Sequence, residues 1–549
     1  MIANIALPNG AWITNTFDNN GRMLGTWLTN STSNIDSSVY TYNVGNQRTS
    51  VTRTGENTAT YTYDAISEVV SDLAAEGPTN RLNEQLHYVL DPVGNLLYRT
   101  NNTLIANFTV NSDNELTANT NGGKLTVMGT TTSVATNVTV NATNTAQRYG
   151  DATFAATNFP FLTSYTAIAA DNFGRHSTNT VNVTITANTT YQYDGNGNLT
   201  NDGVRNFTYD DENQLIQVWA SNQWFSQFSY DGKMRRRIRQ EFTWQSGQWV
   251  QTNAVYYVYD GNVVIQERNI KNLPTTTYTR GLDLSSTLDG AGGIGGLLAM
   301  TLNTAPGPSS SNSYYYHSDG NGNVTMLVNP WQYIVAKYLY DAFGNTLSAA
   351  GSLAPANVYR FSSKEAHLNS GLVYYLYRYY DPNLQRWPNR DPLGEPGFEA
   401  ISSRPFSQYP DDPNLYLFAQ NNPTGFVDEE GLSGTAVIAG GGILSGLGEG
   451  ITIGVGGAVA IGAGVGIGLG ALLDTYTPIG NIGPWICERH ESGQRNYMND
   501  LADNLAKKHN KTPCQILDEL MAAAKKSGNT AEQQAIKQAQ KVAGCRRHN

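Results

Sequence analysis

The sequence predicts a mainly β protein, made of many short strands joined by tight turns. Tyrosine and glycine are unusually abundant, with 32 and 54 copies among 549 residues, whereas only 15% of the residues are charged. Strands favour Tyr, Thr and Val, and turns favour Gly, Asn and Asp, so this composition is typical of a β protein. A Tyr-Asp pair followed by a turn also recurs along the chain, which indicates a repeat array.

The clearest repeat spans residues 191–218, YQYDGNGNLTNDGVRNFTYDDENQLIQV, and contains two successive copies of the unit. Alternate aromatic residues before the turn point to one face of a strand, because side chains alternate with a period of two. Asp194 ends the strand, since its carboxylate can accept hydrogen bonds from backbone N–H groups ahead of it. We expect Gly195 and Gly197 to supply the positive φ that hairpin turns need.

Other copies of the unit lie on both sides of this repeat. Clear copies begin at Phe228, Tyr256, Tyr278, Tyr314 and Tyr338, and weaker copies begin at Tyr61, His87 and Asn107. Because one hairpin cannot bury its own apolar face, we expect the copies to stack into one continuous array in which no unit folds alone.

Residues 117–190 differ from the rest of the array. They are rich in Thr, Asn and Ala and contain alternating stretches such as TNVTVNATN and TVNVTITANTT. This alternation predicts strands. The strands form either an inserted sandwich-like module or a divergent part of the array.

A closing segment, residues 357–432, follows the last repeat. It resembles the repeat-associated core of the RHS family, and the repeats before it resemble the YD repeats of RHS proteins, teneurins and Tc-toxin C components. The resemblance covers roughly residues 50–432. In the closing segment it rests on Gly371, Leu372, Tyr374, Tyr375, Arg378, Tyr380, Asp381, Pro382, Arg390, Asp391, Pro392, Asn414, Leu415, Tyr416, Asn421, Pro423, Asp428, Gly431 and Leu432.

The resemblance implies a spiralling β-hairpin shell that is hollow. In that family the core acts as an intramolecular aspartate protease, which cuts after its terminal leucine and leaves the C-terminal segment inside the shell. Carried over to this sequence, the scissile bond is Leu432–Ser433. The shell's first partner is then the chain's own C-terminal segment.

Aspartate proteolysis needs two carboxylates with different pKa values, one to activate water and one to protonate the leaving group. The resemblance makes Asp391 the first candidate, and we expect the adjacent Arg390 to favour its ionised form. Asp428 is the expected partner carboxylate. Asp411 and Asp412 are the alternative partners.

Two features depart from the family pattern and bear on cleavage. The insertion EPGFEAISSRPFSQYPDD separates Asp391 from the Asn-Leu-Tyr motif, and Glu429 stands where the pattern has proline. Asp-Pro and Asp-x-x-Gly sequences also form turns, so Asp391 and Asp428 have a purely structural interpretation as well.

An apolar, glycine-rich stretch follows Leu432. Residues 450–473, GITIGVGGAVAIGAGVGIGLGALL, carry no charge and are long enough to cross a bilayer as a helix. Gly-x-x-x-Gly spacings would let two such helices approach closely. The alternatives are a flexible linker or an apolar stretch held unfolded within the shell, because glycine is a poor helix former in water.

The last residues predict a small helical unit. Thr512 and Pro513 form an N-cap followed by proline, and apolar residues follow at helical spacing. Thr530 and Gln533 form a capping box for a final helix, which Gly544 ends. The tail has no recognisable nucleophile–base arrangement, so the sequence assigns it no activity.

All three cysteines lie in the tail, so disulfides do not hold the repeats together. The pairs Cys487/His490 and Cys545/His548 have zinc-ligand chemistry but follow no known finger spacing. We therefore expect free thiols or a disulfide, and neither a metal site nor a cofactor.

The net charge and the N-terminal sequence limit the possible location and partners of the protein. A net charge of −10 argues against nucleic-acid binding by the repeat region, because a phosphate backbone repels an acidic surface. The opening MIANIALPNGAW shows no signal peptide. Since the chain opens within repeat-like sequence, we expect a truncated product or a fragment, with a cell-envelope or secreted location.

These observations divide the chain into five expected segments and favour one function. The segments are 1–190 (divergent β repeats), 191–356 (YD repeats), 357–432 (core), 433–474 (apolar segment) and 475–549 (variable helical domain). We expect a bacterial polymorphic toxin whose payload is released after Leu432, with secretion machinery, an immunity protein and a membrane as further partners. The alternative is a non-enzymatic surface or adhesion protein anchored by the apolar segment.

Overall fold

The computed structural model describes most of the chain as far as Leu432 and short stretches beyond it. The described residues are 2–131, 134–183, 187–303, 312–393, 398, 414–432, 434–438, 442–443, 512–526, 536–537 and 540. They fall into two compact units: one comprises residues 1–393 and 410–445, and the other residues 394–409 and 446–549. Each unit is described by itself.

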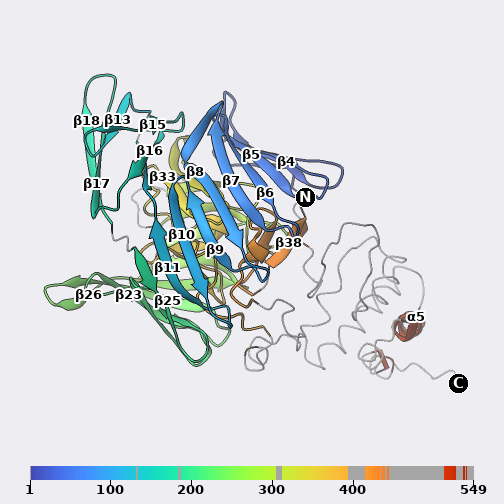
Figure 1. Ribbon diagram of the computed structural model, residues 1–549. Helices are drawn as coiled ribbons and strands as arrows, with labels where there is room; N and C mark the ends of the chain where they lie inside the picture. Colours follow the sequence, from blue (N-terminus) through green and yellow to red (C-terminus); the bar gives the residue numbers. More distant parts are fainter. Residues whose placement is uncertain are drawn as a thin grey trace. The chain divides into compact units, whose positions relative to one another are not determined.

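The first unit begins with a 12-stranded sheet in which nearly every strand pairs with its neighbour in the sequence (Figure 1). All of its pairings are antiparallel. Its strands are β1 (Asn4–Ala6), β2 (Trp12–Phe17), β3 (Met23–Thr29), β4 (Asn34–Tyr42), β5 (Arg48–Arg53), β6 (Asn57–Tyr63), β7 (Val69–Glu76), β8 (Thr79–Leu90), β9 (Leu96–Asn101), β10 (Leu104–Val110), β11 (Leu116–Gly122) and β19 (Asn188–Thr190).

A 14-stranded antiparallel sheet follows in strict sequence order. Its strands are β20 (Gln192–Tyr193), β21 (Leu199–Asn201), β22 (Arg205–Tyr209), β23 (Leu215–Ala220), β24 (Trp224–Tyr230), β25 (Arg236–Gln245), β26 (Gln248–Asp260), β27 (Val263–Arg268), β28 (Pro274–Arg280), β29 (Leu297–Leu302), β30 (Ser313–Ser318), β31 (Val324–Val328), β32 (Ile334–Tyr340) and β33 (Thr346–Ala350). The mainly β fold class is therefore confirmed.

One turn geometry links many of these strands, and Asp194 illustrates it. Its Oδ1 accepts hydrogen bonds from the N–H groups of Asn196 and Asn198, both at 2.9 Å. Gly197 has a φ of 81°, whereas Gly195 is not among the residues with positive φ, so the expectation for Gly195 was wrong. The same pair of bonds recurs at Asp18, Asn43, Asp64, Asp91, Asn111, Asp171, Asp210, Asp231, Asn269, Asp319, Asn329 and Asp341.

The residues between β11 and β19 form two small sheets, while β11 pairs directly with β19. Their strands are β12 (Leu125–Thr130), β13 (Asn137–Val140), β14 (Asn144–Thr145), β15 (Gln147–Arg148), β16 (Thr153–Phe159), β17 (Ser164–Ala170) and β18 (His176–Asn182). Phe154, Phe159 and Tyr165 belong to a hydrophobic cluster of their own there. This inserted module therefore has a separate core.

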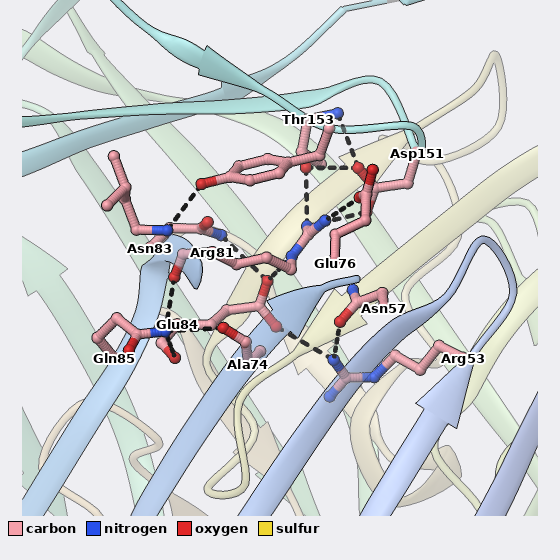
Figure 2. A network of polar contacts seen from close by, with 12 residues as sticks. Arg53, Asn57, Ala74, Glu76, Arg81, Asn83, Glu84, Gln85, Asp151 and Thr153 are labelled. Carbon is pink, nitrogen blue, oxygen red and sulfur yellow. Dashed lines mark hydrogen bonds and ion pairs between the residues drawn. The ribbon is translucent and has the colours of Figure 1, made fainter. Parts of the chain in front are cut away.

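A buried arginine joins the inserted module to the first sheet (Figure 2). Arg81 is fully buried, and its Nη2 lies 2.9 Å from Asp151 of the module. Its Nη1 lies 3.2 Å from Glu76, and its Nε donates to Glu84, both of which belong to the first sheet. Because a buried charge needs paired opposite charges, this network fixes the module to the β7–β8 hairpin.

The two large sheets also contact each other through the turns of the second. The rings of Tyr88 and Phe343 lie 4.9 Å apart, and the N–H of Gly320 donates to the hydroxyl of Tyr40 at 2.6 Å. The closing segment then contacts both sheets. The Asn421 amide donates to Glu68, in the turn before β7 of the first sheet, at 2.8 Å. The hydroxyl of Tyr374 accepts from the Arg236 N–H of the second sheet at 2.9 Å. The elements of the closing segment are η2 (Phe361–Ser363), β34 (Glu365–His367), β35 (Leu372–Tyr374), β36 (Tyr379–Tyr380), η3 (Ala419–Asn421) and β37 (Phe426–Asp428), and β38 (Gly434–Ile438) and β39 (Gly442–Ile443) follow it.

In the second unit the structure describes the helix α5 (Pro513–Lys526). It begins where the sequence predicts: the Gln515 N–H donates to the Thr512 hydroxyl at 3.3 Å, and the Thr512 N–H donates to the Gln515 side chain at 2.8 Å. Cys514 is disulfide-bonded. None of the helices in the described residues combines the length and apolar character needed to cross a bilayer. The apolar segment 450–473, the pairs Cys487/His490 and Cys545/His548, the Thr530/Gln533 capping box and Gly544 lie outside the described residues.

Candidate self-cleavage site

The turn after β37 is held by one carboxylate. Asp428 ends the strand, and its Oδ1 accepts hydrogen bonds from the N–H groups of Glu430 (3.2 Å), Gly431 (2.6 Å) and Leu432 (3.0 Å). Gly431 has a φ of 83°, a conformation that glycine adopts without strain. β38 pairs with β37, so the chain reverses direction here. Asp428 is therefore bound to the backbone that leads into the expected scissile bond.

Arg378 connects that backbone to Asp391, the other carboxylate of the expected pair. The arginine is buried, and its Nη2 donates to the carbonyl oxygen of Leu432 at 2.9 Å and to Oδ2 of Asp391 at 2.7 Å. Its Nε donates to the carbonyl oxygen of Gly431. The guanidinium lies over the ring of Trp387, 4.2 Å from its centroid. One planar cation thus contacts both the carbonyl group and a carboxylate.

Burial dominates the electrostatics of both carboxylates. It raises the pKa of Asp391 to about 7, although Arg378 and the N–H of Leu393 oppose this shift. Burial also raises the pKa of Asp428, against the effects of Arg378 and of the N–H groups that it accepts from. Among the described residues, Oδ2 of Asp428 has no hydrogen-bond partner, and Arg378 Nη2 lies 3.8 Å from it.

Arg390 does not play the part that the sequence suggested. Its side chain is exposed and passes the turn at Gly197, where an added Cβ would lie 2.6 Å from Arg390 Cδ. The cation that opposes the raised pKa of Asp391 is Arg378. Adjacency in sequence was a poor guide here, because the Arg390 side chain lies against the turn at Gly197, whereas Arg378 contacts Asp391. Arg378 was visible as a motif residue of the closing segment, but no local signal paired it with Asp391.

Lys364 is a further charged residue that the sequence did not single out. Its Nζ donates to the carbonyl oxygen of Glu429 at 2.6 Å and to that of Gly292 at 2.8 Å. Burial lowers its pKa to about 8. Gly292 packs so closely on the backbone of Glu429 that an added Cβ would lie 1.9 Å from the Glu429 carbonyl oxygen. Lys364 and the loop around Gly292 therefore brace the chain just before Leu432.

The structure thus brings Asp391, Asp428 and Leu432 together around Arg378. Leu432 itself is buried, with 3% of its surface exposed. Ser433 and the alternative carboxylates Asp411 and Asp412 lie outside the described residues. Two buried carboxylates with raised pKa values beside a carbonyl held by a cation can, as chemistry, support acid–base hydrolysis of a peptide. Among the described residues no cluster has the composition of a metal site.

Comparisons with known proteins agree with the sequence resemblance. Residues 489–549 match the family model Ntox34, described as bacterial toxin 34. Over 244 residues, 44% of this chain, the sequence is 31% identical to the tRNA3(Ser)-specific nuclease WapA of Bacillus spizizenii. Over 257 residues it is 24% identical to the double-stranded DNA deaminase toxin A of Burkholderia cenocepacia, which covers 45% of this chain. The chain is therefore similar to RHS-type toxins in its repeat region and to a bacterial toxin family at its C-terminal end.

The chain spans a small part of those relatives. The matched region is 9% of the length of the WapA protein and 17% of the length of the deaminase toxin. Among solved structures, the crystal structure of TcdB2-TccC3-Cdc42 is similar over 77% of this chain and 21% of its own chain. The identity is 18% and the TM-score is 0.35. The TcdB2-TccC3 crystal structure gives a TM-score of 0.33 at 17% identity, with 77% of this chain and 21% of that chain covered.

Proposed function

We propose that this protein is an RHS-type toxin precursor that cuts its own chain between Leu432 and Ser433. The observation that carries the proposal is the contact of Arg378 with both the Leu432 carbonyl oxygen and Asp391, next to Asp428.

In the proposed reaction Asp428 acts as the general base. Its Oδ2 is free among the described residues, while three N–H groups on Oδ1 favour its ionised form. A water molecule gives a proton to Asp428 as its oxygen attacks the carbonyl carbon of Leu432. Arg378 stabilises the negative charge that develops on the carbonyl oxygen.

Asp391 acts as the general acid. Its raised pKa keeps a proton available near neutral pH. When the carbon–nitrogen bond breaks, this proton goes to the nitrogen of Ser433, which leaves as an amine. The carboxylic acid formed at Leu432 gives its own proton to that amine, so that the products are a carboxylate and an ammonium group. The proton held by Asp428 then restores Asp391. Lys364 has a positioning role, since it holds the Glu429 carbonyl oxygen and not the reacting group.

Intact-mass measurement tests the cleavage. We expect the wild-type chain to give two fragments that separate after Leu432, and Asp391→Asn and Asp428→Asn variants to stay full length. Asp411→Asn and Asp412→Asn serve as matched controls and should be cut like the wild type. A wild-type chain that stays at full mass after folding would exclude the proposal.

We further propose that the two β sheets form a shell around the released segment and that residues 475–549 form the toxic domain. The match of residues 489–549 to a bacterial toxin model supports this assignment. From Gln494 onward the tail carries ten Lys and Arg against five Asp and Glu, so its charge is opposite to that of the whole chain. An immunity protein produced by the same cell would be the corresponding partner.

Expression of residues 433–549 alone tests the toxic domain. We expect growth inhibition when this segment is made inside bacteria and no inhibition from residues 1–432. Cell fractionation tests the competing adhesion function, which requires shell and tail to remain together in the membrane fraction. Harmless expression of the tail together with such co-fractionation would favour adhesion.

A further inference from the structure

The inserted module ends on an exposed edge strand. β18 is the last strand of the sheet β14–β13–β17–β18 and pairs with β17 along its whole length, without a bulge. All seven of its residues, His176–Asn182, are exposed. The next longest edge strand of the described sheets, β12, lies near the edge strand β33, where the hydroxyls of Thr130 and Ser348 are 2.7 Å apart. Among the described residues, β18 is therefore the longest open strand edge.

The outer edge of β18 presents unpaired backbone groups. The Val183 N–H donates to the carbonyl oxygen of Thr163, and the Asp171 N–H donates to that of Arg175. Groups that bond to β17 alternate with groups that point away from it, because the pairing is antiparallel. The groups that point away belong to the even-numbered residues: His176, Thr178, Thr180 and Asn182. Within the described part of the chain, these N–H and C=O groups have no hydrogen-bond partner.

The strand lacks the features that keep exposed edges apart. Natural sheets shield an edge with Lys, proline, a bulge or a covering segment. The sequence of β18, HSTNTVN, has neither Lys nor proline, and its register with β17 is regular. Val181 lies opposite the core residue Tyr165 and is nevertheless 51% exposed. Such an edge can accept a further strand.

We propose that β18 pairs edge to edge with β18 of a second copy of the chain. In an antiparallel register centred on Asn179, His176 lies opposite Asn182 of the second copy, and Thr178 lies opposite its Thr180. This register pairs every outward N–H and C=O group of both strands, because the hydrogen-bonded pairs then form between even-numbered residues. The two four-stranded sheets become one continuous sheet with a two-fold axis at its centre.

The side chains of β18 favour a second copy as the partner. Threonines opposite each other on paired strands interact favourably, whereas like charges opposite each other are unfavourable. From His176 to Asn182 the strand has no Asp, Glu, Lys or Arg, so two copies meet there without charge repulsion, although each chain carries a net charge of −10. A strand of an unrelated protein is the alternative occupant, and it would leave the purified chain monomeric.

Sedimentation of the full chain tests the pairing. One strand pair buries little surface, so we expect a weak dimer that forms as the protein concentration rises from about 1 to about 200 µM. Thr178→Lys with Thr180→Lys should raise the dissociation constant by about tenfold or more, because the register places lysines of the two copies opposite each other. Thr60→Lys with Thr62→Lys is the matched control and should dimerise like the wild type. These threonines are exposed two positions apart on β6, which has a strand on each side.

A charge exchange separates loss of pairing from loss of folding. Thr178→Glu with Thr180→Glu should weaken the dimer as the lysine pair does. An equal mixture of the lysine and glutamate variants should form a heterodimer, because opposite charges then lie opposite each other. Misfolded variants could not restore each other's pairing.

Four results would overturn the proposal. The first is a wild-type chain that stays monomeric at every concentration, and the second is a lysine pair on β18 that dimerises like the wild type. The third is an equal loss of dimer from the lysine pair on β6, which would place the interface elsewhere. The fourth is a mixture of the lysine and glutamate variants that stays monomeric.

Discussion

Arg378 donates a hydrogen bond to the carbonyl oxygen of Leu432 at 2.9 Å, although 54 positions separate the two residues in the sequence. The same nitrogen lies 2.7 Å from Asp391. Because Arg378 is 2% exposed, water screens its charge little, and the guanidinium acts strongly on the groups it touches. The proposed cleavage therefore depends on this arginine as much as on the two carboxylates.

Arg378→Lys should slow self-cleavage by about 10²–10³-fold, the typical effect of removing one donor from a developing oxyanion. A lysine keeps the charge but cannot contact the Gly431 and Leu432 carbonyls and Asp391 together. The full-length fraction on a denaturing gel, followed during folding, measures the rate. Arg390→Lys, at an exposed position, should be cut like the wild type. Equal rates for the two variants would show that Arg378 is not involved.

Self-cleavage should decrease as the pH rises through about 7. Burial raises the pKa of Asp391 to about 7, and in the proposed reaction its protonated form is the acid. That form is populated below this pH and lost above it. Full-length chain purified in denaturant can be refolded in buffers from about pH 5.5 to about pH 8.5 and the cut fraction measured. A rate that increases across this range would assign the acid to another group.

The hairpin turns could be predicted from the sequence because their determinants are local. The Asp194 carboxylate binds N–H groups two and four residues ahead, so a short window contains the whole interaction. The copy at Asp231 was also found from its Tyr-Asp pair, although Met234 has the positive φ there in place of glycine. Contacts between distant segments had no such signal. The pairing of β11 with β19 crosses the inserted module, and the partner of Asp391 proved to be Arg378 and not the adjacent Arg390.

Asp72→Asn should stabilise the protein at alkaline pH. Burial raises the pKa of Asp72 to about 7, against the opposing effect of Arg53. Since this pKa lies above that of the unfolded chain, the folded state binds the proton more tightly, and stability is lost as the pH rises from about 4 to about 7. The amide cannot ionise, so we expect a gain of about 2–4 kcal/mol at pH ~8 and almost none at pH ~4.

Chemical denaturation at the two pH values measures the effect of Asp72→Asn. Asp113→Asn is the matched control, because Asp113 is exposed in a turn of the same sheet. This variant should have the same free energy of unfolding as the wild type at each of the two pH values. The Ala342 N–H donates to Asp72 at 2.8 Å, and the asparagine carbonyl oxygen can accept the same bond. A loss of stability at alkaline pH would mean that the electrostatic attraction of Arg53 outweighs burial.

Arg81→Met should destabilise the protein by about 3–5 kcal/mol, because it leaves buried carboxylates without their cation. Arg81 is fully buried and pairs with Glu76, Glu84 and Asp151, and Asp151 belongs to the inserted module (Figure 2). We also expect limited proteolysis to cut within residues 123–187 sooner than elsewhere, since the network no longer holds the module on the β7–β8 hairpin.

Arg175→Met is the control for this substitution. Its side chain is 78% exposed and pairs with Asp171 inside the module, so the change should alter stability by less than about 0.5 kcal/mol. If Arg81→Met lowered stability without earlier proteolysis of the module, the β11–β19 pairing and the remaining contacts would hold it in place without Arg81. Equal effects of the two substitutions would show that burial of Arg81 adds nothing to its ion pairs.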